Sequence, residues 1–122
     1  MTEYDAVIAG GGLAGLSLAA HLAEFGWRNR RVLIADEPGT VAPTACWGSW
    51  STGTGLLDGA ACRTYHRVRI DAGPTATVLP LGRYRYQLVR RADLTRLAAD
   101  LIAGCPRFAT CRMWKDGRGS TR

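Results

Sequence analysis

The sequence lacks most of the residue groupings on which hydrolytic and metal-dependent enzymes rely. Only 2 histidines occur among its 122 residues, and it contains no HExxH motif and no Ser/His/Asp set. The 4 cysteines include no C-x-x-C pair, so a zinc site is not expected and we assign no metal ligand. No pair of carboxylates stands out as acid and base, so the residues alone identify no catalytic group.

Lysine is nearly absent, because 15 of the 16 basic residues are arginines. Residues 1–61 hold 3 basic and 6 acidic residues, whereas residues 62–122 hold 13 and 4. A basic half is compatible with nucleic acid, an anionic membrane surface, a phosphate-rich cofactor or a solvated arginine-rich surface. The chain contains no known nucleic-acid module, so we expect no nucleic-acid partner.

Signals for secretion or membrane insertion are also missing. Residues 6–26 are nearly apolar, but Glu3 and Asp5 stand where a signal peptide carries basic residues. A membrane span there would bury His21 and Glu24. We therefore expect a reduced, cytoplasmic protein, and a net charge of +6 with 47% hydrophobic residues suits one globular domain.

A β–α–β pattern is present over the first 36 residues. Residues 4–9 form a short apolar run that ends in three glycines, which is typical of a buried parallel strand. Residues 13–25 follow a helical period, and residues 31–36 are predicted as a second buried strand, which together favour an α/β fold with a right-handed crossover. The apolar face predicted for the helix comprises Leu16, Leu18, Ala19, Leu22 and Phe25.

The rest of the chain is less regular. Residues 37–59 are rich in Gly, Pro, Thr and Ser and predict an irregular segment with a helical turn. Apolar alternation and helical spacing then predict a hairpin of strands 67–71 and 76–79, a strand 84–89, a helix 91–103 and a strand 107–114. Asp116-Gly117 is typical of a hairpin turn, and we expect no returning strand after it, which would indicate an incomplete polypeptide.

Residues 10–15, Gly-Gly-Gly-Leu-Ala-Gly, match GxGxxG between the first strand and the helix. In this setting the motif predicts a dinucleotide site. Gly10 permits the tight turn, Gly12 lets the backbone approach a pyrophosphate, and Gly15 lets the helix pack close to the sheet. The free N–H groups at the helix N-terminus attract the phosphates. The alternative is a glycine-rich packing turn that binds no ligand.

Two charged residues complete the predicted site. Asp36 ends the second strand, where its carboxylate can accept a hydrogen bond from a ribose 2′-OH and would repel a 2′-phosphate, so FAD or NAD is favoured over NADP. Arg90 could contact a cofactor phosphate, lie at the surface, or pair with Asp93. The predicted cofactor-binding residues are Gly10, Gly11, Gly12, Leu13, Ala14, Gly15, Asp36 and Arg90.

Trp47 and Trp50 lie in the segment predicted to be irregular. Two tryptophans so close together could line an apolar pocket beside a flavin ring. They could equally cover the core under a long loop. The sequence leaves both interpretations open.

Three blocks of the chain together resemble the lycopene cyclase family of flavoproteins, the carotenoid ring-forming enzymes. They are residues 5–19, residues 31–36 with Trp47 and Trp50 following, and residues 86–94. The first block is shared by many FAD enzymes, and the tryptophan block is more specific to the family. The chain departs from the family's tryptophan block at Ala45, Cys46 and Ser49.

The resemblance implies an incomplete Rossmann-like FAD/NAD(P)-binding fold with an inserted β-hairpin region. Residues 1–122 would be the N-terminal part of a single FAD-binding domain. Its parts would be the dinucleotide motif 4–36, an irregular and strand segment 37–90, a helix and strand 91–114, and a tail 115–122.

The resemblance also implies lycopene β-cyclase activity, an isomerase or intramolecular lyase reaction on lycopene or a related carotenoid. The linear ends of the substrate become β-ionone rings without net redox change, yet FAD must be reduced, with NADPH as the electron donor. Because carotenoids reside in membranes, peripheral membrane contact is expected. The family's catalytic acid lies beyond residue 122, so this chain by itself is not assigned an activity.

Two other functions are also compatible with the sequence. The first is another FAD-dependent oxidoreductase or monooxygenase, such as a hydroxylase or amine oxidase, which would turn over with net redox change. The second is a non-catalytic, truncated product that retains the glycine-rich turn.

Overall fold

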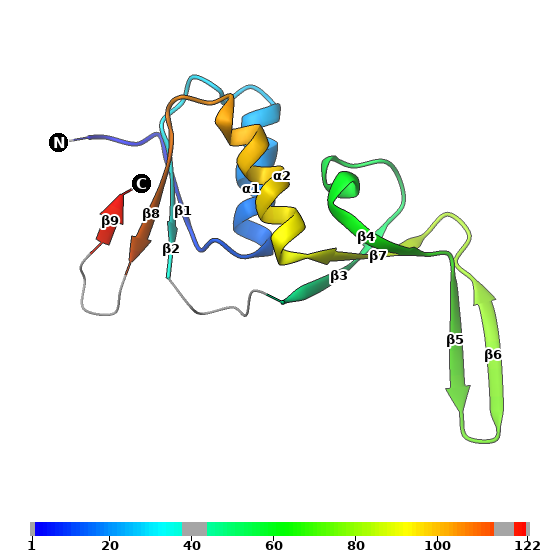
Figure 1. Cartoon of the computed structure of the whole chain (residues 1–122). Coiled ribbons are helices and arrows are strands. Elements are labelled where there is room, and N and C mark those ends of the chain that lie inside the picture. The colour runs from blue at the N-terminus through cyan, green and yellow to red at the C-terminus, as the bar shows by residue number, and fades with distance from the viewer. Residues whose placement is uncertain (1, 38–43, 114–118, 122) are drawn as a thin grey trace.

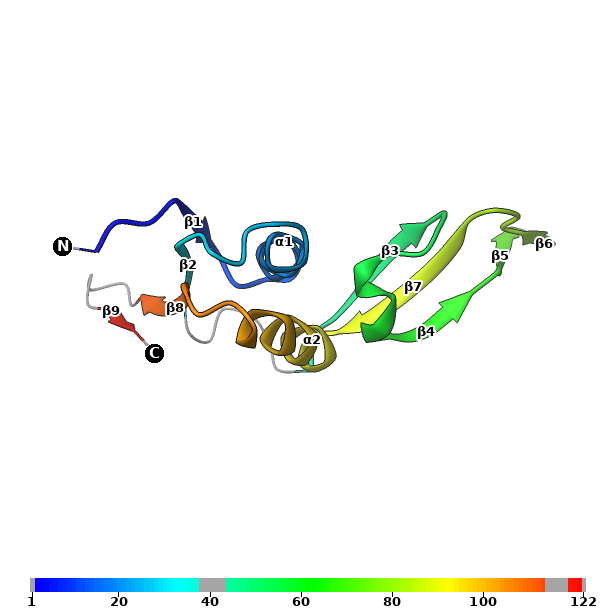
Figure 2. The same cartoon turned by 90° about the horizontal axis from the view of Figure 1, so that it is seen from above.

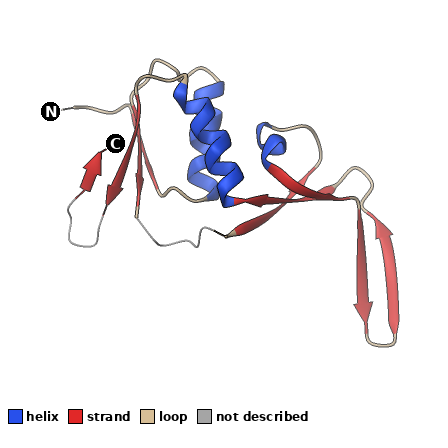
Figure 3. Cartoon of the chain, in the orientation of Figure 1, coloured by secondary structure: helices blue, strands red, loops and turns tan. Residues whose placement is uncertain are grey.

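The computed structural model of the chain describes residues 2–37, 44–113 and 119–121. Helices lie beside one sheet, and further strands extend away from them (Figure 3). This arrangement confirms the α/β class. In chain order, the elements are β1 (Ala6–Ala9), α1 (Leu13–Glu24), β2 (Val32–Asp36), β3 (Cys46–Ser51), the 3-10 helix η1 (Leu56–Ala60), β4 (Ala61–Tyr65), β5 (Arg67–Ala72), β6 (Thr75–Pro80), β7 (Arg85–Arg90), α2 (Arg91–Ala103), β8 (Phe108–Met113) and β9 (Gly119–Thr121).

Three parallel strands lie side by side in the first sheet, in the order β1-β2-β8. Ile8 of β1 lies beside Ile34 of β2, and Ile34 lies beside Thr110 of β8. Short apolar runs suit such strands, because a parallel sheet is covered by its crossover helices. The predicted strands over 4–9, 31–36 and 107–114 are confirmed as β1, β2 and β8, although Trp114 lies outside the described residues.

Both helices lie side by side on one face of this sheet (Figures 1 and 2). The buried face of α1 consists of Ala19, Ala20 and Ala23, which are at most 1% exposed. The predicted apolar face is wrong in part, because Leu18 and Phe25 are 50% and 70% exposed. Since α1 packs against both the sheet and α2, only small side chains fit on its inner face.

A second, antiparallel sheet has the order β3-β7-β4. The prediction of an irregular segment over 37–59 is wrong for residues 46–51, which form β3, and β4 was not predicted. Gly, Ser and Thr weaken the local strand signal, but β7 lies between β3 and β4 and supplies backbone hydrogen bonds to each of them. The predicted helical turn is confirmed as η1.

The β5–β6 hairpin extends away from the rest of the molecule (Figure 1). It confirms the predicted strands over 67–71 and 76–79. Gly73 supplies the positive φ of +61° that the connecting turn needs.

Strand β9 pairs antiparallel with β8, with Thr121 opposite Cys111. The expectation that no strand returns after Asp116-Gly117 is therefore wrong, although the turn itself lies outside the described residues. A three-residue strand of Gly, Ser and Thr has no apolar alternation, so sequence patterns do not reveal it.

The core has two parts. Ile8, Ala19, Val32 and Ile34 pack between α1 and the parallel sheet. The second part lies between α2 and the antiparallel sheet and contains Ala60, Val89 and Leu94, with Leu94 fully buried. Leu13, Leu16 and Trp47 pack against this second part. The first turn of α1 therefore contacts the second part of the core.

Candidate functional site

The turn between β1 and α1 forms the centre of the candidate site. Gly10 has a φ of +109°, as the tight turn requires, and its N–H donates to the Ala35 carbonyl at 2.6 Å. A Cβ at Gly15 would overlap the Gly10 carbonyl oxygen, so α1 approaches the turn more closely than any other residue would allow. A Cβ at Gly12 would meet open space. Within the described residues, no side chain caps the N-terminus of α1 at Gly12.

Asp36 lies against the turn from the end of β2. Its Oδ1 accepts hydrogen bonds from the N–H groups of Gly11 and Glu37, both at 3.0 Å. A Cβ at Gly11 would lie 2.6 Å from Oδ2 of Asp36. Gly11, the variable position between the first two glycines of the motif, therefore leaves the space that the aspartate occupies.

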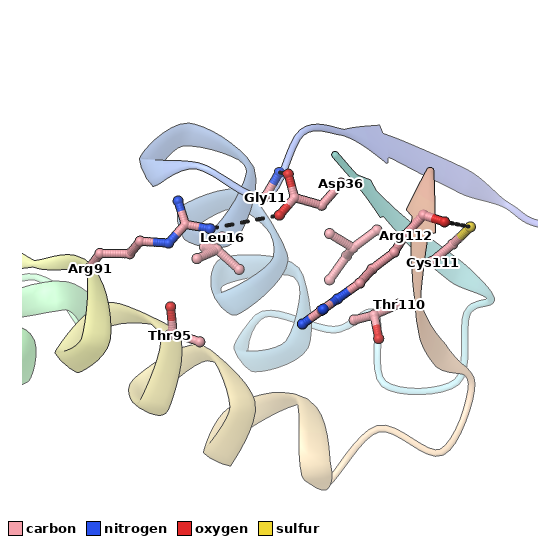
Figure 4. Close-up of a pocket in the computed structure, with 9 residues that line it drawn as sticks. Gly11, Leu16, Asp36, Arg91, Thr95, Thr110, Cys111 and Arg112 are labelled. Carbon is pink, nitrogen blue, oxygen red and sulfur yellow. Dashed lines mark hydrogen bonds and ion pairs between the residues drawn. The ribbon is translucent and has the colours of Figure 1, made fainter. Parts of the chain in front are cut away.

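Arg91 approaches Asp36 from the first turn of α2. Its guanidinium lies 3.7 Å from Oδ2 of Asp36, and both side chains are mostly buried. The pair borders a cavity of about 260 Å³ at the carboxyl ends of the parallel strands. Arg91 and Arg112 extend toward this cavity from opposite sides (Figure 4). The lining is completed by Gly11, Leu16, Ile34, Thr95, Thr110 and Cys111. Two arginines and one aspartate favour an anionic ligand with hydroxyl groups.

Arg90 is exposed and does not line this cavity. Its expected partner Asp93 pairs instead with Arg96, at 3.7 Å. Arg91 was not among the residues predicted for the site, although helical spacing places it on the same face as Leu94, three residues later. Because Leu94 is fully buried, the residue three positions before it also faces the inside of the molecule.

The two tryptophans lie on opposite faces of the second sheet, because three positions separate them along β3. Trp50 is 61% exposed and packs edge-on against Tyr86, with ring centroids 5.0 Å apart. Trp47 faces α1, packs against the second part of the core and lines a cavity of about 330 Å³. Only Trp47 is therefore in a position to border a ligand next to α1.

This second cavity borders α1 at Leu13 and Ala14, whereas the Asp36 cavity borders it at Leu16. Its lining is largely apolar, with a few polar side chains between. The lining residues are Leu13, Ala14, Ser17, Trp47, Ser49, Leu57, Gln87 and Val89. Leu13 and Ala14 of the predicted site thus border this cavity, whereas Gly11 and Asp36 border the first.

An ion pair supports the wall of the second cavity. Oδ2 of Asp58 accepts from the Gly55 N–H at 2.9 Å and from the Arg85 guanidinium at 3.0 Å. The side-chain amide of Gln87 donates to Oδ1 at 3.3 Å. The pKa of Asp58 lies below its ordinary value. The hydrogen bond from the Gly55 N–H contributes most to this lowering, and the Gln87 amide and the Arg85 charge contribute less.

Comparison with known proteins gives two findings. A family model described as "Lycopene cyclase protein" matches residues 5–115. A crystal structure of a mutant of MHPCO matches with a TM-score of 0.59 at 16% identity, covering 98% of this chain and 37% of that chain. At this identity the likeness shows the fold alone, and the chain spans 37% of that protein's length. No curated protein sequence gives a match. In the described part of the chain, no helix is both long and apolar enough to span a membrane.

We predict that acid weakens the fold through Asp58. A folded-state pKa below the unfolded value of about 3.9 means that the carboxylate contributes stability above that pH and loses it as the pH falls through the folded pKa. Urea unfolding between about pH 5 and pH 2 should show a smaller acid-induced loss of stability for Asp58→Asn than for the parent chain. Asp71→Asn, which alters only an exposed ion pair, is the control and should keep the parent's pH dependence.

Proposed function

We propose a function from one premise: the chain belongs to the lycopene cyclase family. Residues of the two cavities bind FAD, and the bound flavin serves the conversion of the linear ends of lycopene or a related carotenoid to β-rings. The observation that carries the FAD proposal is the glycine turn at the uncapped N-terminus of α1, with Asp36 held against it. The order β1-α1-β2-α2-β8 then corresponds to one half of a Rossmann-like domain.

The residues present suit the phosphates of a dinucleotide. The open space at Gly12 leaves room for a pyrophosphate directly at the N-terminus of α1. The first-turn N–H groups of a helix have no intrahelical partners, so they can donate to phosphate oxygens. Asp36 would receive the ribose hydroxyl on Oδ2, because Oδ1 is already engaged by the Gly11 and Glu37 N–H groups.

Arg91 replaces Arg90 in the proposed cofactor site. Its guanidinium holds Oδ2 of Asp36 and also borders the cavity, so it can orient the carboxylate and attract phosphate charge. The Arg91 N–H donates to the Ala45 carbonyl at 2.9 Å, which ties the start of α2 to the chain just before β3.

The reaction we propose has no net redox change. A proton adds to a terminal double bond, the ring closes through a carbocation, and a proton is lost. When bound in reduced form, with NADPH as electron donor, FAD supplies negative charge that stabilises the developing cation. The chain's own residues bind and orient the cofactor, and we assign none of the described residues as the proton donor.

We further propose a cytoplasmic location with contact to an anionic membrane surface, from which a carotenoid can be taken up. The β5–β6 hairpin supports this proposal, because Ile70, Val78 and Leu79 are 44–57% exposed on it. Arg67 and Arg69 belong to the same hairpin, which thus combines apolar and cationic side chains.

The hairpin proposal predicts binding to lipid vesicles. The chain should sediment with vesicles of phosphatidylglycerol and not with phosphatidylcholine alone, and Ile70→Ser/Leu79→Ser should weaken sedimentation several-fold. Phe25→Ser is the control, because it removes an apolar side chain from α1 that is more exposed, at 70%, than Ile70 or Leu79. Equal loss in both variants, or none in either, would contradict a role for the hairpin.

The cofactor proposal predicts that Gly12→Val abolishes FAD binding. The branched side chain occupies the open space at the N-terminus of α1, and losing hydrogen bonds to a charged group costs about 1.5–3 kcal/mol each. The loss of two or more such bonds lowers affinity by at least about a hundredfold, so no binding should be detected in the titration. Quenching of FAD fluorescence on titration with protein measures this. Gly59→Val, at an exposed glycine with open space, should bind FAD as the parent does. Undiminished binding by Gly12→Val would falsify the assignment.

The assignment of Arg91 predicts different effects at two adjacent arginines. Arg91→Met removes the charge that faces Asp36 and should weaken FAD binding by about tenfold, the equivalent of one charge-assisted hydrogen bond. Arg90→Met makes the same chemical change at an exposed position and should leave affinity within about twofold. The same titration measures both, and a reversed order of effects would restore Arg90 as the phosphate contact.

A further inference from the structure

Gln87 is a buried polar residue for which the proposed function, as stated above, has no role. It lies on β7, is 8% exposed and faces the 330 Å³ cavity beside Trp47. Its neighbours across the ladder are Ser49 on β3 and Thr64 on β4. A buried amide normally has partners for both its N–H₂ and its carbonyl.

Asp58 determines which end of the Gln87 amide faces the cavity. An ionised carboxylate can only accept, so the side chain of Gln87 must turn its N–H₂ group toward Oδ1 of Asp58. Oδ2 is held by Gly55 and Arg85, which fixes the carboxylate itself. The lowered pKa of Asp58 keeps it ionised at neutral pH.

The carbonyl oxygen of Gln87 is therefore available to a ligand. Within the described part of the chain, Oε1 accepts no hydrogen bond, and it is not among the fully enclosed atoms. The cavity around it is mostly apolar and bounded on one side by the indole of Trp47. Such a lining suits a flat ring that carries an N–H group at one edge.

We propose that Oε1 of Gln87 accepts a hydrogen bond from a ring N–H of the bound cofactor, and that Asp58 is the positioning residue that presents it. The inference rests on the proposed function, in which the ring is the isoalloxazine of FAD, whose N3 carries a hydrogen. Both cavities border the start of α1, with Leu13 and Ala14 on one and Gly11 and Leu16 on the other. One dinucleotide passing Gly12 can thus place its nucleoside in the first cavity and its ring in the second.

The experiment compares FAD with 3-methyl-FAD, whose ring N–H is blocked. Both are titrated into the full chain, with flavin fluorescence and absorbance as readouts. The parent should bind FAD about tenfold more tightly than 3-methyl-FAD, because the methyl group on N3 leaves the buried acceptor of Gln87 without its donor. Gln87→Met keeps the side-chain length but removes the acceptor, so it should bind both flavins about equally, within roughly twofold.

Two further variants separate recognition from simple packing. Leu88→Met changes the neighbouring residue, which faces the other side of the sheet, and should keep the parent's discrimination. Asp58→Asn lets the partner amide donate as well as accept, so Gln87 is no longer forced into one orientation and discrimination should fall several-fold while FAD still binds. Circular dichroism confirms that each variant is folded.

The outcomes distinguish the inference from the function on which it rests. If FAD binds, Gly12→Val abolishes binding, and the parent does not discriminate between the flavins, the role of Gln87 is overturned and the proposed function stands. Discrimination that persists in Gln87→Met also overturns it. If the folded parent binds neither flavin, both proposals fail.

Discussion

The close approach of α1 to the glycine turn is the constraint on which the site depends. Because Gly15 has no Cβ, the first turn of the helix lies directly on the Gly10 carbonyl. That approach puts the N-terminus of α1 at the carboxyl ends of the parallel strands, where Asp36 reaches the Gly11 N–H. The alanine face of α1 continues the same close packing against the sheet and α2. A larger residue at any of these points would move the helix dipole away from the place where phosphate charge is bound.

Strand β7 and helix α2 connect the two cavities. The chain passes from Arg90 of β7 into Arg91 of α2 without a loop. Gln87 therefore faces the Trp47 cavity, while Arg91 faces the Asp36 cavity. Leu94 anchors this junction in the second part of the core. A ligand that fills both cavities would contact one continuous, well-packed segment, which favours precise placement of its two ends.

Two ion pairs position polar side chains that line the two cavities. Arg91 holds Asp36, and Arg85 holds Asp58, and all four side chains are mostly buried. Pairs of this kind add little net stability, because desolvation offsets much of the attraction. Their effect is positional: the first presents a carboxylate to a hydroxyl donor, and the second turns the Gln87 amide toward the second cavity.

The sequence by itself determined the local features of the site. The glycine turn, the parallel strands before and after α1 in the chain and the position of Asp36 at the end of β2 all follow from one β–α–β unit, which the residue patterns over 4–36 predict. Other features depend on partners far apart in the chain, and only the tertiary structure decided them. Strand β3 exists because β7 pairs with it, Arg91 meets Asp36 from a distant segment of the chain, and Gln87 is turned by an aspartate 29 positions away. Local sequence patterns do not indicate such distant partners, because strand pairing and burial are properties of the whole fold.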